Sequence, residues 1–200
     1  MNKFEVRSIK SYNTKADNYD TTLDGKFTMK FKEMLINAVS IPNGVNVLDI
    51  ACGNGTFLKM LSQNNSFSGY GTDIAEKMIE NAKRINPTMS FEVASCDNLP
   101  FKDESMDVVT VCAAFHHFPN VNRFAKEVFR VLKRDGMVYI AEVYYPAFIR
   151  TICNPFVPLS KAGDVRFYGP NEIITLFENY NFHRELFTKE GHVQIIQMRK

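Results

Sequence analysis

Short apolar runs alternate with amphipathic segments along this chain of 200 residues. Runs bounded by turn-forming residues are typical of buried strands, and five of them lie at 45–51, 67–74, 89–96, 107–113 and 136–144. Apolar residues that recur every three or four positions predict the intervening helices at 56–63, 75–85 and 121–133. The alternation of strand and helix favours a parallel sheet covered on both faces.

Two of these helices carry a clear apolar face. The predicted faces consist of Ala75, Met78, Ile79 and Ala82 in one helix and of Phe124, Val128, Val131 and Leu132 in the other. Gly136 is expected to end the second helix. Both helices should therefore pack their apolar face on the sheet.

The remaining segments flank this alternating core. A helix is expected at 27–40, and residues 8–24 look like a short helix or an ordered arm. The stretch 145–169 is rich in proline and aromatic residues and reads as an irregular insertion, before a helix at 170–180 with Pro170 in its first turn. Two terminal strands, 183–189 and 192–200, would turn around Gly191 as a hairpin. The predicted fold is one α/β domain over residues 1–200, a Rossmann-like three-layer sandwich whose mostly parallel seven-stranded sheet ends in an antiparallel hairpin.

Composition narrows the functional classes. The formal net charge of +2 and the lack of a basic run argue against a nucleic-acid partner or a membrane surface. No apolar stretch is long enough for a membrane span, and the polar N-terminus suggests a cytoplasmic protein. The four cysteines, Cys52, Cys96, Cys112 and Cys153, form no C-x-x-C pair and show no ligand spacing with the histidines. We therefore expect neither a disulfide framework nor a metal site.

A glycine turn follows the first predicted strand in "VLDIACGNGTFLKML". Gly53 and Gly55 allow a tight turn that approaches a ligand closely. The dinucleotide fingerprint G-x-G-x-x-G fails, because its third position is Leu58 or, counted from Ala51, Thr56. The phosphate-binding G-x-x-x-x-G-K-[ST] motif is absent as well. The turn is thus not expected to hold a pyrophosphate.

Three carboxylates end neighbouring strands of the predicted sheet. Asp49 precedes the glycines and suits a ligand with a cationic end, whereas it would repel a pyrophosphate. Asp73 lies 20 residues after Gly53 (73 − 53), where an acidic residue accepts hydrogen bonds from ribose hydroxyls. Asp97 follows the third strand and could accept one from an exocyclic amine. A cation, a ribose and a base amine together describe S-adenosylmethionine, although each aspartate alone could be a helix cap or turn former.

At this point the chain resembles a family, the class I S-adenosylmethionine-dependent methyltransferases of the small-molecule, quinone-biosynthesis-like type. The resemblance is carried in order by "LDIACGNG", "GTDIAEKMIENAKR", "ASCDNLPFKDESMDVVTVCAAFHHFPN" and "EVFRVLKRDGMVYIAE", over roughly 12–144. Ala51 replaces the first glycine of the family's turn, and its methyl group needs ordinary φ/ψ there.

The resemblance implies a cofactor site in which Asp49 and the backbone of Ala51–Gly55 hold the methionine part of the cofactor and Asp73 the ribose. It also implies that an N-terminal arm, residues 1–25, folds over the cofactor. The full set of expected cofactor-binding residues is Tyr12, Tyr19, Asp49, Ala51, Cys52, Gly53, Asn54, Gly55, Asp73, Ile74, Met78, Cys96, Asp97, Asn98, Cys112 and His117. The two tyrosines could instead pin the arm to the domain.

Candidate catalytic and acceptor residues follow the fourth and fifth strands. His117 and His116 border the expected cofactor or acceptor, and a histidine could take a proton from the acceptor. Either ring could equally cap a helix or satisfy buried backbone. Glu142, Tyr144, Tyr145 and Phe148 are the candidates for a substrate pocket, with 145–169 as its cap.

Three functions remain open from the sequence. The preferred one is methyl transfer from S-adenosylmethionine to a small-molecule acceptor by in-line displacement. An accessory module that binds the cofactor without catalysis is the alternative. An NAD(P)-dependent oxidoreductase is disfavoured by the missing third glycine. The oligomeric state, monomer or homodimer, is left open.

Overall fold

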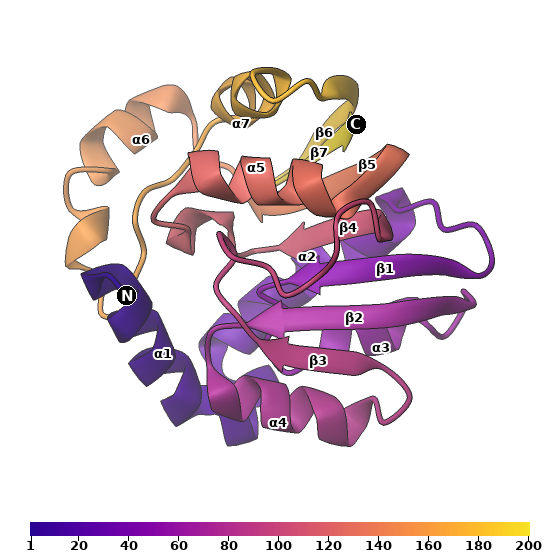
Figure 1. Ribbon diagram of the computed structural model, residues 1–200. Helices are drawn as coiled ribbons and strands as arrows, with labels where there is room; N and C mark the ends of the chain where they lie inside the picture. The colour runs from indigo at the N-terminus through magenta and orange to yellow at the C-terminus, as the bar shows by residue number, and fades with distance from the viewer.

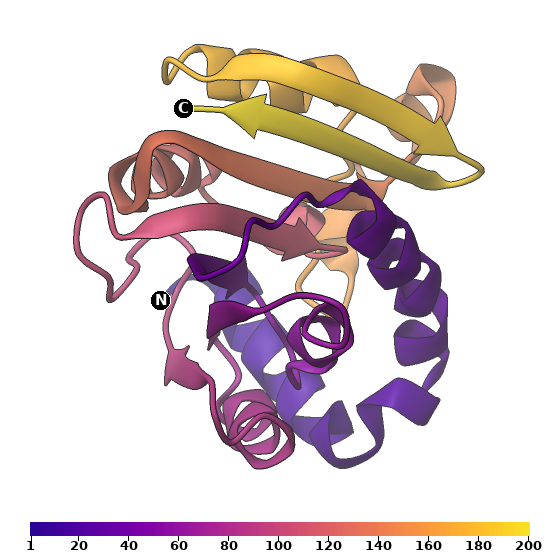
Figure 2. The same ribbon diagram turned by 90° about the vertical axis from the view of Figure 1, so that its right-hand side faces the viewer.

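A twisted seven-stranded sheet runs through the middle of the computed structural model, which describes residues 1–200 (Figure 1). The strand order is β3-β2-β1-β4-β5-β7-β6. The first five strands are parallel and comprise β1 (Val45–Ile50), β2 (Phe67–Asp73), β3 (Ser90–Val93), β4 (Met106–Cys112) and β5 (Leu132–Val143). The hairpin of β6 (His183–Glu190) and β7 (Val193–Arg199) adds antiparallel to β5 at one edge (Figure 2). The predicted fold class is confirmed.

Helices cover both faces of the sheet, because successive strand residues point to opposite sides. Val47 and Val108 pack with α2 (Leu23–Ala38), α3 (Thr56–Leu61) and α4 (Glu76–Ile85). Their neighbours Leu48 and Val109 pack with α5 (Val121–Val131) and α7 (Pro170–Glu178) on the other face. The parallel strands are therefore buried on both sides, which explains their continuous apolar sequence.

The predicted helix faces are buried. Every member of the two sets, Ala75, Met78, Ile79 and Ala82 and also Phe124, Val128, Val131 and Leu132, is at most 2% exposed. Of the first set, only Ile79 and Ala82 pack on the sheet. Ala75 and Met78 instead pack with Ala16, Tyr12 and Tyr19 of the N-terminal segment. The Asn120 side chain caps α5 by accepting a hydrogen bond from the Arg123 amide at 3.1 Å. Glu172 accepts one from the Gly169 amide at 2.8 Å at the start of α7.

The boundary between α5 and β5 differs from the prediction. The helix ends at Val131, and Leu132 already pairs with Met106 as the first residue of the strand. Asp135 adopts a φ of 60° where the strand register shifts. A Cβ at Gly136 would lie 2.8 Å from the Lys133 carbonyl oxygen, so this glycine permits the irregular strand instead of ending the helix.

The N-terminal segment is more helical than expected. The helix α1 (Lys3–Lys15) is followed by the 3₁₀ helix η1 (Ala16–Thr21), and α2 begins at Leu23 and not at residue 27. A capping box starts α1, since the Asn2 side chain accepts from the Glu5 amide and Glu5 accepts from the Asn2 amide. The Thr22 hydroxyl caps α2 in the same manner, at 3.0 Å from the Gly25 amide.

The insertion 145–169 also contains regular structure. It forms α6 (Ala147–Cys153) and the 3₁₀ helix η3 (Val157–Leu159), where we expected irregular chain. No residue of α6 is buried, and its apolar side chains stay exposed, with Phe148 at 66% and Ile152 at 63%.

The insertion docks on α1 across the carboxyl ends of the parallel strands (Figure 1). Arg7 donates to the Pro158 carbonyl at 2.8 Å, and the Ser8 hydroxyl donates to the Ala162 carbonyl at 3.1 Å. Gly163 has a φ of 84°, and a Cβ there would lie 2.3 Å from the Ser8 hydroxyl oxygen. Only glycine fits this close approach.

The structure contains no helix long and apolar enough to cross a membrane.

Candidate active site

A cavity opens where the strand order reverses, between the carboxyl ends of β1 and β4. Open α/β sheets bind their ligands at this position. The cavity has a volume of about 740 Å³, part of it open to solvent. Of the residues expected at the cofactor, those that line it are Tyr12, Tyr19, Ala51, Gly53, Asp73, Ile74, Met78, Cys96, Cys112 and His117.

The glycine turn at its floor is left-handed at three positions. Ala51, Gly53 and Gly55 have φ values of 57°, 54° and 77°. The expectation of ordinary φ/ψ at Ala51 was wrong, because the chain must turn sharply directly after β1. A left-handed alanine costs on the order of 1–2 kcal/mol, and such strain is typical of ligand sites.

Asp73 holds this turn against the end of β2. One carboxylate oxygen accepts from the Gly53 amide and the other from the Ala75 amide, both at 2.9 Å. Burial raises the pKa of Asp73, although both amide bonds oppose the shift. A carboxylate has about four acceptor positions, so Asp73 can accept further hydrogen bonds from a ligand in the cavity.

Asp49 lies beneath the turn and does not line the cavity. Its side chain is 1% exposed and accepts a hydrogen bond from the Thr110 hydroxyl at 2.7 Å. Burial raises its pKa to about 7, against the lowering effects of that bond and of Lys32. A carboxyl group that titrates near neutrality is unusual in a structural position, and it lies under the expected cation site.

Five other expected residues lie outside the cavity lining: Cys52, Asn54, Gly55, Asp97 and Asn98. Asn54 instead donates to Asp20 at 2.9 Å. Asp97 accepts from the Ser95 hydroxyl at 2.8 Å and lies 3.7 Å from the Arg123 guanidinium.

Glu5 and Ser95 line the cavity and were missed by the sequence analysis. They lie within hydrogen-bond distance of each other, 3.2 Å apart. No pattern in the sequence places Glu5 there, because its approach to Ser95 depends on how α1 docks.

A second cavity adjoins the first. It has a volume of about 690 Å³, and Tyr12, Tyr19, Ala113 and His117 line both cavities. Its remaining walls are largely apolar and aromatic, and include Phe27, Phe31, Val143, Tyr145 and Phe167. The two spaces therefore meet at the end of β4, where Ala113 has a φ of 52°.

Of the four residues expected in a substrate pocket, only Tyr145 lines the second cavity, with its ring 4.9 Å from that of Phe167. Glu142 is fully buried beneath His116. Lys189 lies 4.4 Å above the Tyr144 ring. The Phe148 side chain is 66% exposed on α6 and lines neither cavity.

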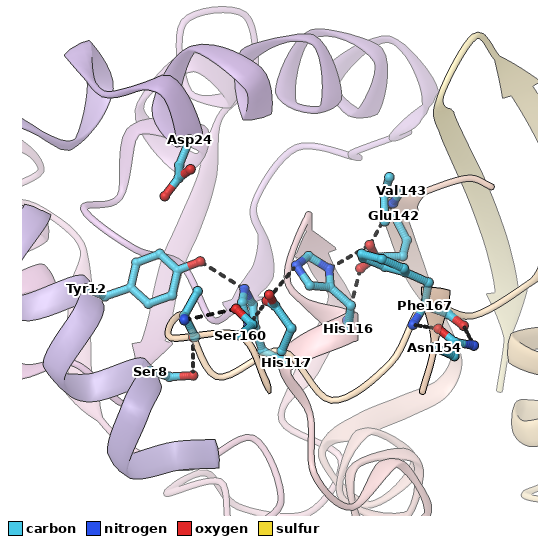
Figure 3. Close-up of polar contacts among 12 residues, drawn as sticks. Ser8, Tyr12, Asp24, His116, His117, Glu142, Val143, Asn154, Ser160 and Phe167 are labelled. Atoms are coloured by element: carbon cyan, nitrogen blue, oxygen red, sulfur yellow. Dashed lines mark hydrogen bonds and ion pairs between the residues drawn. The ribbon is translucent and has the colours of Figure 1, made fainter. Parts of the chain in front are cut away.

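The histidine pair lies between Tyr12 of α1 and Glu142 of β5 (Figure 3), and both rings line the second cavity. His116 Nδ1 is 2.7 Å from Glu142, and His117 Nε2 is 2.9 Å from the Tyr12 hydroxyl. His117 Nδ1 lies 2.9 Å from Asp164. Burial lowers the pKa of both rings, but the Glu142 carboxylate outweighs this effect and raises that of His116. The pKa of His117 stays lowered, since the neighbouring His116 adds to the effect of burial.

Asp164 is a further residue that could not be located from the sequence. It belongs to the insertion, and no spacing connects it to the histidines. The structure brings it there because the Val165 amide donates to the His116 carbonyl at 2.8 Å.

The sequence and the fold of this chain are similar to those of known proteins. Residues 48–140 match the family model described as a methyltransferase domain. Demethylmenaquinone methyltransferase of Thermotoga maritima is 30% identical over 90% of each chain. The ubiquinone/menaquinone biosynthesis C-methyltransferase UbiE of Rickettsia typhi is 34% identical over 60% of this chain, which spans about half (54%) of that protein.

A solved structure supports the fold. A chain from the complex of the Haloferax volcanii Trm112 methyltransferase activator with a methyltransferase superposes with a TM-score of 0.80 at 17% identity, covering 100% of this chain and 98% of its own. Together, the structural match and the sequence relatives cover all of the alternating strands and helices of this chain. The chain belongs to the class I S-adenosylmethionine-dependent methyltransferases, in the family that includes demethylmenaquinone methyltransferase, and it is an enzyme that methylates a small-molecule acceptor.

Proposed function

We propose that the acceptor is a hydroquinone with an apolar substituent, bound in the second cavity while S-adenosylmethionine occupies the first. One observation carries this proposal: Tyr12, Tyr19, Ala113 and His117 line both cavities, so a cofactor in one and an acceptor in the other would approach each other at these four residues. The aromatic walls of the second cavity suit a flat, apolar ring. The relatives are named for methylation in menaquinone and ubiquinone biosynthesis.

The cofactor's orientation follows from the charges in the first cavity. Asp73 would accept hydrogen bonds from the ribose hydroxyls, with Ile74 and Met78 against the adenine. Asp49 and the turn from Ala51 would hold the cationic methionine end. Ser95 and Cys96 line the cavity where we expected Asp97 and Asn98, and therefore take over the adenine edge in this proposal.

The methyl transfer needs alignment above all. An electron pair of the acceptor attacks the methyl carbon, the carbon–sulfur bond breaks, and its electron pair neutralises the sulfonium. The acceptor loses a proton, so the products are the methylated acceptor and S-adenosylhomocysteine. Holding both reactants in line supplies about 7–11 kcal/mol. Tyr12 and the insertion cover the region where the two cavities adjoin and would exclude water from it.

The titration of Asp49 gives a pH dependence. Because its pKa is raised to about 7, Asp49 is neutral below that value and negative above it. The affinity for cationic S-adenosylmethionine should therefore rise several-fold between about pH 6 and pH 8. Isothermal titration calorimetry would measure the change. The Asp49→Asn variant should show a flat profile, and an unaltered profile in that variant would assign the titration to another group.

The same shift makes the free protein less stable as the pH rises from 3.8 toward about 7. Folded Asp49 holds its proton more tightly than unfolded Asp49 does, and this advantage is lost once both states ionise.

Transfer of a radiolabelled methyl group tests the acceptor class. The panel comprises a reduced naphthoquinone with a short isoprenoid chain, the same compound without the chain, a catechol, an alkyl thiol and a primary amine. We expect labelling of the two hydroquinones, with the prenylated one preferred. Labelling of only the thiol or amine would refute the hydroquinone proposal. Cofactor binding without turnover of any compound would favour an accessory role.

A further inference from the structure

We propose that His116, His117 and Asp164 form a binding site for one divalent transition-metal ion at the wall of the second cavity. All three residues line that cavity. Metal binding here does not depend on the proposed function. Only the suggested role of the ion, to hold an oxygen of the acceptor, rests on it.

The three donor atoms lie close to the separations of a metal site. His116 Nε2 lies 3.7 Å and His117 Nδ1 lies 2.9 Å from the same Asp164 oxygen, and all three atoms lie within 4.8 Å of one another. Ligands about 2.0–2.2 Å from a zinc-like ion lie roughly 3–3.5 Å apart in a tetrahedron. A small side-chain adjustment would therefore place one ion within reach of all three.

One donor atom is otherwise unexplained. His117 Nδ1 is buried, and it has no hydrogen-bond partner although the Asp164 oxygen is only 2.9 Å away. Against the lowering effect of burial, the Asp164 carboxylate raises the pKa of His117 through this contact, yet the contact does not meet the full geometry of a ring N–H hydrogen bond. Buried polar atoms are rarely left in this state. A cation coordinated by both would account for the contact.

The opposite side of each imidazole is fixed in the way that metal-binding histidines are fixed (Figure 3). His116 Nδ1 contacts Glu142, which is fully buried, at 2.7 Å, and His117 Nε2 contacts the Tyr12 hydroxyl at 2.9 Å. With the ring protons at these two nitrogens, the nitrogens facing Asp164 carry free lone pairs. Such partners orient a histidine and raise its basicity toward a metal.

The donor set indicates both the class of metal and its exposure. Two imidazoles and one carboxylate suit zinc, ferrous iron, cobalt or manganese better than calcium or magnesium. Three protein ligands leave at least one position open, as in catalytic sites. That position would face the second cavity, where a hydroquinone oxygen could bind the ion.

No metal site was expected from the sequence, because the cysteines and histidines lack ligand spacing. The third ligand is an aspartate from the insertion, and the Val165–His116 backbone bond brings it to the histidines. The competing explanation is a metal-free network that links Glu142, the two histidines, Asp164 and Tyr12.

Cobalt(II) titration of the full chain, first freed of metal with EDTA, distinguishes the two. We expect one equivalent of Co²⁺ to bind with visible d–d absorption. The variants Asp164→Asn and His116→Gln should each weaken binding by at least about 100-fold, and Glu142→Gln by about 10–100-fold, as removal of an outer partner does. His183→Gln, a change at an exposed histidine on β6, is the matched control and should leave the affinity unchanged.

Thermal unfolding of each variant verifies that it is folded. The metal site would be overturned if the wild-type protein bound Co²⁺ no more tightly than folded Asp164→Asn does. It would also be overturned if His183→Gln lost as much affinity for Co²⁺ as Asp164→Asn. Addition of catechol to the cobalt protein should shift its absorption spectrum, and an unchanged spectrum would contradict the open position. The titration contains neither cofactor nor acceptor, so its result is independent of the methyl-transfer panel.

Discussion

Replacing Asp73 with alanine should weaken the binding of S-adenosylhomocysteine by about 100-fold or more. Hydrogen bonds to a charged group contribute about 1.5–3 kcal/mol each, and Asp73 would accept two from the ribose. The glycine turn would also lose its bond from the Gly53 amide to Asp73. Calorimetric titration with S-adenosylhomocysteine measures the loss directly.

Asp103→Ala is the matched control, because Asp103 is 75% exposed, pairs with Arg130 and lines neither cavity. Its affinity should stay within about threefold of wild type, as is usual for substitutions away from such a site. Asp73→Asn separates charge from folding, since it retains an oxygen for the Ala75 amide. An unchanged affinity in both Asp73 variants would rule out the ribose role.

Replacing Asp164 with asparagine should abolish most of the methyl transfer while leaving cofactor affinity nearly unchanged. Asp164 lines the second cavity and not the first, and it reaches the first only through His117, so its loss should act mainly on the acceptor side. We expect kcat to fall about 100-fold or more, comparable to the loss of a preorganised electrostatic contact at a reacting centre. Steady-state transfer to the preferred hydroquinone and calorimetry with S-adenosylhomocysteine give the two numbers.

An exposed carboxylate provides the control for this variant. Asp103 is 75% exposed, pairs with Arg130 and lies outside the insertion. The Asp103→Asn variant should therefore retain the full rate of methyl transfer. Treatment of the wild-type enzyme with EDTA should reproduce the Asp164→Asn defect if the ion acts on the acceptor. Loss of cofactor affinity in Asp164→Asn would contradict the separation of the two cavities.

The sheet and its covering helices could be predicted from the sequence because their signals are local. Strands buried on both faces read as continuous apolar runs, and stripes such as Phe124 and Val128 fix a helix face wherever the helix packs. The failures have a different cause. The helix α6 has Phe148 and Ile152 at helical spacing, but it is only seven residues long and lies among prolines, which predict irregular chain. Leu132 joined the strand through its pairing with Met106, which is a tertiary contact.

The residues of the candidate site also separate into those with a local sequence signal and those placed by tertiary contacts. Asp73 and the glycine turn could be located because parallel strands bring their ends to one edge. Glu5 and Asp164 could not, since each reaches the site through the docking of a separate segment, α1 or the insertion. Ala51 was assigned the wrong backbone conformation because an alanine in the left-handed region is uncommon, and only the turn after β1 imposes it.

A crystal structure of the complex with S-adenosylhomocysteine tests the central claim, that two joined cavities divide cofactor from acceptor. We predict the ribose on Asp73, the adenine against Ile74 and Met78, and the sulfur at the junction lined by Tyr12 and His117. The second cavity should remain open for the acceptor. A nucleoside bound in the second cavity, or a sulfur directed away from the junction, would contradict the account.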